Sequence, residues 1–148
     1  MADIRTDLDG TTFAVRAVIL CQRGEKVLVE GGPYPFYNLP GGATALGESL
    51  RDAAAREWHE ETGLTAGELR PVGLIENFFE LGGRRWHELG FYYALAAPQS
   101  LGERLVNADN AANFLDWVSP DTADKPIYPA PALSLLDVPG GIPPHHPP

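Results

Sequence analysis

The sequence predicts an α/β fold in a single domain, and three observations support this. Apolar, β-branched runs over residues 11–20 and 27–29 have the composition of strands and are spaced as a hairpin. Residues 50–62 carry an alanine-rich helical pattern. Two more extended runs, residues 71–81 and 84–97, are separated by two glycines, as in a second hairpin. A chain of 148 residues is long enough for one domain with its own core.

The helix predicted over residues 50–62 has both a start and a stop signal. Ser49 occupies the position of an N-cap, and Asp52 follows three residues later as its capping-box partner. Gly63 can adopt the left-handed conformation that ends a helix, and Leu64 can fold back over the last turn. We therefore expect the helix to begin near Leu50 and to end near Thr62.

The segments on either side of this helix complete the predicted sheet. Residues 36–39 are extended and lead into a sharp turn at Pro-Gly-Gly, residues 40–42. After the second hairpin, residues 98–113 are expected to form a polar loop and residues 113–120 a strand. A second helix is expected around residues 132–136, packed on the sheet.

Composition limits the domain count and the class of partner. One domain is predicted over residues 1–138, and the Pro/Gly-rich tail of residues 139–148 is predicted to be disordered. The formal charge of −9 argues against binding to long nucleic acid, since nonspecific affinity for phosphates comes from Lys and Arg. Cys21 lies in an apolar run, which favours a buried, inert thiol. No segment reaches the about 20 apolar residues of a membrane span, so a soluble, cytoplasmic protein without a membrane partner is predicted.

The predicted helix carries an acidic face. Glu57, Glu60 and Glu61 project together, because residues three and four apart share a face, and a four-residue rise is only about 6 Å. Glu48 approaches from the preceding link, and the single cation Arg56 cannot neutralise the set. A solvated acidic face is the ordinary alternative. Clustered carboxylates are also the ligands that Mg²⁺ or Mn²⁺ prefers, usually with the phosphates of a substrate.

The full spacing of these residues resembles a known motif. Gly42, five residues, Glu48, seven residues and then REWHEETGL, residues 56–64, resemble the Nudix box at every fixed position. The one mild departure is Trp58, where an aliphatic residue is more common. The resemblance is specific in the box and weak over the rest of residues 11–137. It implies a Nudix-type α/β/α sandwich around a mixed β-sheet.

The resemblance also implies an activity and its residues. Nudix hydrolases cleave a nucleoside diphosphate linked to another moiety, with water attacking phosphorus with the help of Mg²⁺ or Mn²⁺. Matched by position, the metal ligands would be Glu57, Glu60, Glu61 and the backbone carbonyl of Gly42. Arg56 and Glu48 would complete the catalytic set by orienting these ligands. The general base stays open among the box glutamates, Glu80 and Glu88.

Residues beyond the box are candidates for substrate binding. In Nudix-like folds the later strands form a wall of the site, so Glu80 or Glu88 could add a metal ligand, and Arg84 or Arg85 could meet phosphate. For each of these charges, an exposed strand face is the ordinary explanation. His87 is expected to be a hydrogen-bonded surface histidine.

Two aromatic residues precede the turn at residues 40–42. Phe36 and Tyr37 could stack on a nucleobase, although such positions more often belong to a core.

The substrate is the least determined part of the interpretation. The proline that tends to mark ADP-ribose hydrolases, roughly sixteen residues past the box, is replaced here by Glu80. We therefore expect a nucleoside triphosphate or a modified nucleotide, with ADP-sugars and dinucleoside polyphosphates as alternatives. A noncatalytic, nucleotide-sensing Nudix module is an alternative of another class. Many relatives pair as dimers, so the resemblance leaves a homodimer open.

Overall fold

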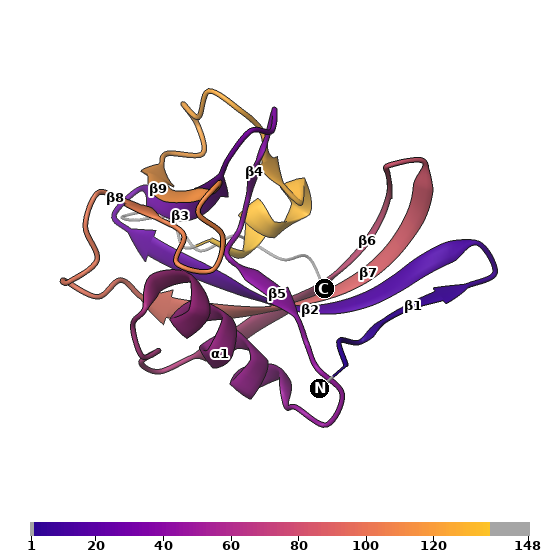
Figure 1. Ribbon diagram of the computed structural model, residues 1–148. Coiled ribbons are helices and arrows are strands. Elements are labelled where there is room, and N and C mark those ends of the chain that lie inside the picture. Colours follow the sequence, from indigo (N-terminus) through magenta and orange to yellow (C-terminus); the bar gives the residue numbers. More distant parts are fainter. Residues whose placement is uncertain (1, 137–148) are drawn as a thin grey trace, which may run out of the picture.

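The computed structural model describes residues 2–136, and the tail predicted for residues 139–148 lies outside the described part of the chain. Its centre is the long strand β2 (Thr11–Arg23). Strand β7 (Arg84–Ala96) pairs with β2 in parallel along nearly its whole length, and β1 (Arg5–Leu8), β5 (Gly41–Ala43) and β3 (Lys26–Gly31) pair with it antiparallel. The sheet is therefore mixed, as predicted (Figure 1).

The outer strands extend this sheet on both sides. Strand β6 (Arg70–Leu81) pairs antiparallel with β7, and both glycines of the connecting turn have positive φ, which favours a tight hairpin. On the other side, β3 pairs with β9 (Phe114–Val118) and β4 (Tyr37–Asn38), and these pair in turn with β8 (Arg104–Val106) and β10 (Ile127–Tyr128).

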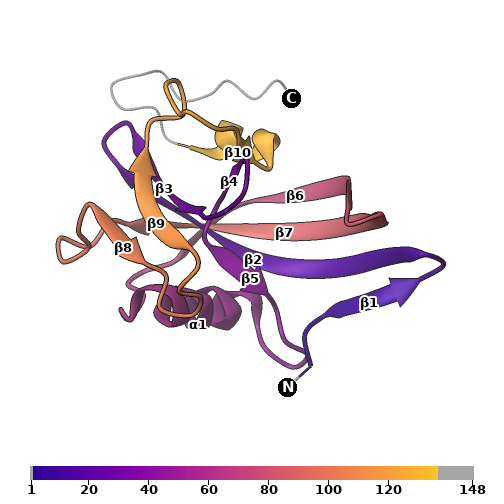
Figure 2. The ribbon, with the colours of Figure 1, turned by 45° about the horizontal axis from the view of Figure 1, so that its top comes forward.

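Two hairpins project away from the body of the molecule. Figures 1 and 2 show the β1–β2 and β6–β7 hairpins leaving the rest of the sheet side by side. We call their outer parts, residues 5–14 and 77–88, the wing. The wing exposes large apolar side chains, of which Phe78 at 66% and Leu8 at 60% are the most exposed.

Helix α1 (Leu50–Thr62) and the 3₁₀ helix η1 (Ala130–Leu135) cover opposite faces of the sheet (Figure 2). Under α1, a core cluster forms around Trp58, which is 0% exposed, so tryptophan at the usually aliphatic box position is accommodated in the core. Under η1, a second cluster includes Val18, Tyr92 and Ala132. The helices and the sheet between them match the predicted sandwich.

The local predictions around the box are confirmed. Helix α1 begins at Leu50 and ends at Thr62, the Ser49 hydroxyl accepts a hydrogen bond from the Asp52 amide at 3.1 Å, and Gly63 has a φ of 76°. These contacts satisfy backbone groups that the helix itself leaves free at its ends.

The second helix is present at Ala130–Leu135, and it is a 3₁₀ helix because Pro131 enters its first turn and the segment is short. Two strands were not predicted. The loop of residues 98–113 contains strand β8, which forms through pairing with β9. The other is strand β1, in the polar N-terminal segment. It forms through hydrogen bonds to β2, and the sequence of residues 5–8 alone does not indicate this pairing.

Candidate active site

The glycine pair before α1 allows the chain to pass closely between β2 and the helix. Gly41 has a φ of 144°, and a side-chain carbon there would lie 2.2 Å from the Ala17 carbonyl oxygen. A side-chain carbon at Gly42 would lie 2.5 Å from the carboxyl group of Glu57. Only glycine fits at position 41, where the neighbouring atoms are backbone, whereas a side chain at position 42 would displace the Glu57 carboxyl group. The backbone of the turn is therefore placed directly beside the first glutamate of the acidic face.

Arg56 organises the carboxylates around this turn. Its guanidinium binds both oxygens of Glu48, at 2.8 and 2.9 Å, and the Ala43 carbonyl at 3.0 Å. It also donates to Glu57 at 2.9 Å and to Glu60 at 3.2 Å. This bidentate pairing with Arg56 holds the pKa of the Glu48 carboxyl below its usual range. Arg56 and Glu48 thus join the loop to the helix.

Glu61 lies deepest in the site. It is 5% exposed, and its Oε2 atom is buried without a hydrogen-bond partner. Burial, with the neighbouring charges of Glu30 and Glu57, raises the pKa of Glu61 to about 9. Burial also raises the pKa of Glu57, although Arg56 opposes this shift. The two carboxyl groups resist joint ionisation, so a positive charge placed between them would be stabilised.

This environment fits a divalent cation. An unpartnered buried carboxylate oxygen and a second carboxylate packed against a glycine backbone are hard oxygen donors of the kind that Mg²⁺ and Mn²⁺ prefer. In residues 2–136, however, no three Asp, Glu, His or Cys side chains are already gathered around one point. Arg56 draws Glu57 and Glu60 toward itself, so cation binding requires these side chains to rotate.

Two charged residues that the sequence interpretation did not single out stand beside Glu61. Glu30, at the end of β3, accepts a hydrogen bond from the Asn107 amide, and burial raises its pKa. Arg16, on β2, lowers the pKa of both Glu30 and Glu61 by its charge. In the sequence, Glu30 stands at the end of an apolar strand and Arg16 stands within one. A charge in an apolar run was the only sequence signal for either residue.

The segment before β9 closes over the end of the box helix. The backbone amide of Ala108 donates to the Glu61 carbonyl at 2.9 Å, and the backbone amide of Asn107 donates to the Asn113 carbonyl at 3.0 Å. The loop predicted over residues 98–113 therefore contacts the candidate site through its second half.

The candidate residues of the later strands lie in two different places. Glu88 approaches Arg16, with 3.9 Å between a guanidinium nitrogen and a carboxylate oxygen. Arg85 pairs with Thr11 of β2, and Glu80 pairs with Arg85. Thr11 lies five residues from Arg16 along β2, so this pair is about 17 Å from Arg16. Only Glu88 of these candidates lies near the box.

The remaining candidates are occupied by contacts of their own. Arg84 binds Asp7 at 2.7 Å, at the outer end of the wing. The Tyr37 ring is buried in the core and its hydroxyl donates to Asp124 at 2.7 Å. Phe36 is partly exposed, stacks on the Tyr34 ring and makes a tilted contact with the Tyr128 ring. His87 hydrogen bonds Glu76 at 2.8 Å, as expected of a surface histidine.

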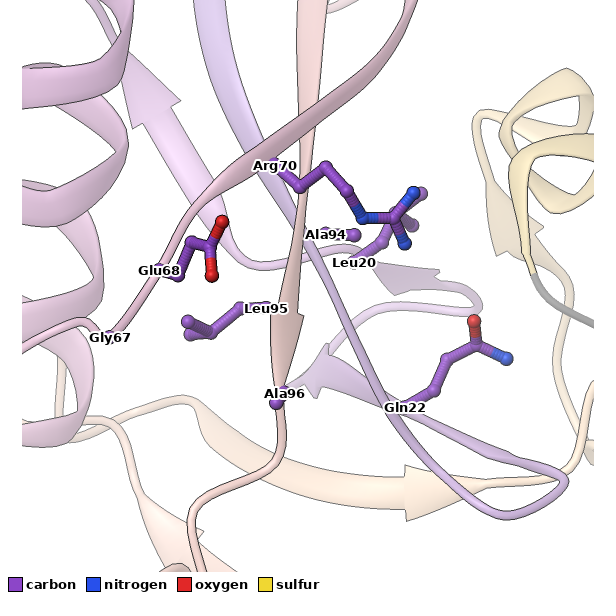
Figure 3. A pocket seen from close by; sticks show the side chains of 8 residues that line it. All are labelled: Leu20, Gln22, Gly67, Glu68, Arg70, Ala94, Leu95 and Ala96. Atoms are coloured by element: carbon purple, nitrogen blue, oxygen red, sulfur yellow. The ribbon is translucent and has the colours of Figure 1, made fainter.

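No box residue lines either of two hollows on the described surface. One, of about 390 Å³, lies at the end of β2 and β7 that is farther from the wing and is lined by Leu20, Gln22, Gly67, Glu68, Arg70, Ala94, Leu95 and Ala96 (Figure 3). The other, of about 440 Å³, lies on the wing beside Phe78 and Trp86. The carboxylates of the box therefore lie outside both hollows.

Cys21 is fully buried, and burial raises the pKa of its thiol to about 12, so it is an inert core residue. No helix within residues 2–136 is long and apolar enough to cross a membrane.

Comparison with known proteins agrees with this fold. The model of the NUDIX domain matches residues 10–137. The chain therefore belongs to the NUDIX domain family, the class that the mixed sheet and the box helix define.

Among individual proteins, a relative from Mycobacterium tuberculosis (strain CDC 1551 / Oshkosh) carries the name MutT4 and is 34% identical over 83 residues, which make up 56% of this chain. The aligned part covers only 32% of that longer relative. A MutT NUDIX hydrolase from Burkholderia pseudomallei has a similar fold, with a TM-score of 0.66 at 21% identity over 83% of this chain and 95% of its own. The E. coli ORF135 protein is similar with a TM-score of 0.56 at 25% identity, over 88% of this chain and 91% of its own.

Proposed function

We propose that this protein is a Nudix pyrophosphohydrolase that cleaves a phosphoric anhydride bond in a nucleoside diphosphate linked to another moiety. Its preferred substrate would be a nucleoside triphosphate or a modified nucleotide. The observation that carries the proposal is the buried, unpartnered Oε2 atom of Glu61 beside Glu57 and the Gly42 backbone, within an intact Nudix box. Family membership and the similarity to relatives named MutT support the same class.

Each box residue has a role in this proposal. Glu57, Glu60, Glu61 and the Gly42 carbonyl would hold Mg²⁺ or Mn²⁺. The ion would supply charge neutralisation on phosphate oxygens and lower the pKa of bound water. Glu48 and Arg56 would keep the box loop and the helix carboxylates in one arrangement, as their hydrogen bonds indicate.

Proton removal from the attacking water needs a carboxylate close to the reaction. Glu88 remains a candidate base because it lies near the box, together with the box glutamates. The placement of Glu80, Arg84 and Arg85 on the outer wing makes a direct role for them depend on a substrate long enough to reach there.

The experiment that tests the proposal is a panel of nucleoside triphosphates, modified nucleotides, ADP-sugars and dinucleoside polyphosphates incubated with Mg²⁺ or Mn²⁺. Products are identified by chromatography. We expect one class to be cleaved at an anhydride bond, and Glu61→Gln to lower turnover roughly a hundredfold or more without unfolding the protein. Glu25→Gln, an exposed glutamate in the β2–β3 turn, is the matched control and should retain activity.

The alternative function has its own outcome in this experiment. Binding of a nucleotide with a metal ion, without turnover of any member of the panel, would favour the noncatalytic sensing module. Equal activity in wild type and Glu61→Gln would contradict the assignment of the site.

A further inference from the structure

The two arginines of the site differ in how many of their donors are used. A guanidinium has five N–H donors. Arg56 makes hydrogen bonds to Glu48, Glu57, Glu60 and the Ala43 carbonyl, so its charge is committed within the protein. Arg16 makes one ion pair, at 3.9 Å, and in residues 2–136 no hydrogen bond is formed by its guanidinium. Its donors are available to a ligand.

The backbone holds Arg16 at the edge of the box. Strand β5 pairs Ala43 with Arg16 and Gly42 with Ala17, which brings paired Cα atoms to about 5 Å. On its other side, Arg16 pairs with Gly90 of β7, which contributes no side chain of its own, and the Tyr92 ring lies over that glycine. The Arg16 side chain is 23% exposed, so it is reachable from solvent while its strand is central in the sheet.

Arg16 interacts with three carboxyl groups. Glu88 lies at 3.9 Å from the wing side, and the guanidinium also acts on the carboxyl groups of Glu30 and Glu61. The ion pair between Arg16 and Glu88 is longer than a hydrogen bond, so another anion can easily replace Glu88 as the partner of the guanidinium. Phosphate oxygens suit a planar guanidinium with free donors better than they suit an ammonium group.

We propose that Arg16 is a substrate-binding residue that exchanges its contact with Glu88 for a phosphate group of the nucleotide. This inference rests on the proposed function, since it names how that site would hold the diphosphate. In the free protein Glu88 keeps the guanidinium beside the box. In the complex the guanidinium binds a phosphate oxygen next to the carboxylates of α1.

The test uses methylenediphosphonate, a diphosphate analogue that has no base and no cleavable anhydride bond. Its binding to the full chain is measured by calorimetry with Mg²⁺ present. We expect Arg16→Gln to weaken binding roughly 10- to 100-fold, as for loss of a charged hydrogen bond. Arg16→Lys should bind with intermediate affinity, and Glu88→Gln at least as tightly as wild type. Lys26→Gln is the matched control: it also removes a positive charge, but on β3, where Lys26 pairs with Arg23, seven residues along β2 from Arg16.

Equal binding by wild type and Arg16→Gln, or an equal loss in Lys26→Gln, would overturn the inference. So would absence of methylenediphosphonate binding to the wild-type protein. If Arg16→Gln does not fold, the comparison of Arg16→Lys with wild type decides, because the lysine keeps the charge but loses the planar donors. In turnover assays Arg16→Gln should chiefly raise KM.

The inference and the proposed function fail separately. Arg16-dependent binding in a protein that hydrolyses no nucleotide would support Arg16 as a phosphate-binding residue and refute the enzyme. Turnover that is unchanged in Arg16→Gln would leave the enzyme and refute the role of Arg16.

Discussion

The segment from Leu39 to Leu64 and the wing are both built from local patterns that the sequence displays plainly, yet they behave differently in the structure. In the box segment, Trp58 is fully buried and Arg56 links the loop to the helix. In the wing, Phe78 is 66% exposed and the charges pair near the surface. A clear local pattern therefore predicts a helix or strand but not how deeply it is buried. The acidic residues of the box are functional candidates because they are partly withdrawn from water.

The largest expected effect concerns the ionisation of Glu61. Burial and the charges of Glu30 and Glu57 raise the pKa of Glu61 to about 9, whereas an unfolded glutamate has a pKa of about 4.3. Between these values the folded, metal-free chain binds a proton that the unfolded chain releases. The free energy of unfolding should therefore fall as the pH rises through this window.

Urea denaturation in the presence of a chelator, at several pH values, measures this dependence. Glu61→Gln should show a flatter profile, and Mg²⁺ should restore stability to wild type more than to the variant. Parallel profiles for the two proteins would show that Glu61 does not carry the shift.

The comparison between box and wing can be tested with one aromatic residue from each. Trp58→Ala should lower the free energy of unfolding by about 3–5 kcal/mol, because it opens a cavity in the core under α1. Phe78→Ala should change it by less than about 0.5 kcal/mol, because most of that side chain is already in water. Chemical denaturation of both variants measures the difference, and a large loss in Phe78→Ala would reveal a partner for the wing.

Arg56 tests whether the box loop depends on its ion pairs. Arg56→Ala leaves Glu48 and Glu57, whose side chains are 8% and 12% exposed, without their cation. Because Arg56 is itself partly exposed, we expect a loss of about 2 kcal/mol rather than the full cost of a buried pair. Arg56→Lys should be intermediate, since lysine cannot bind Glu48 with two parallel bonds. Unchanged stability of Arg56→Ala would show that the loop is held by its backbone pairing alone.

The smallest effect belongs to the helix cap. Ser49→Ala should cost about 1 kcal/mol, since the hydroxyl accepts a hydrogen bond from the Asp52 amide. The kcat of the proposed hydrolysis should change little, because Ser49 lies at the opposite end of α1 from Glu60 and Glu61. Thermal denaturation and steady-state kinetics measure the two effects, and a large loss of kcat at unchanged stability would contradict this reading.

The elements and the acidic face were predictable, while the full surroundings of that face were not. The hairpin of β6 and β7 follows from two extended runs joined by glycines, and the box helix from its caps and alanines. Arg16 and Glu30 were missed because single charges in apolar strands have no local signature that separates a site residue from an exposed one. The second helix was predictable in place but not in type, because its 3₁₀ geometry depends on the shortness of the segment and on Pro131 in its first turn.

The sequence by itself determined the long strands β2, β6 and β7, the box helix with both of its ends, the order of the carboxylates along that helix and the family to which they point. These features depend on backbone propensity, capping and residue spacing, which act over a few positions. The tertiary structure alone decided that β2 pairs in parallel with β7, that Glu61 is buried and that Arg16 and Glu30 stand beside it. Those outcomes come from contacts between residues far apart in the chain. Apolar burial is non-directional, so strand pairing and close packing select which distant side chains meet.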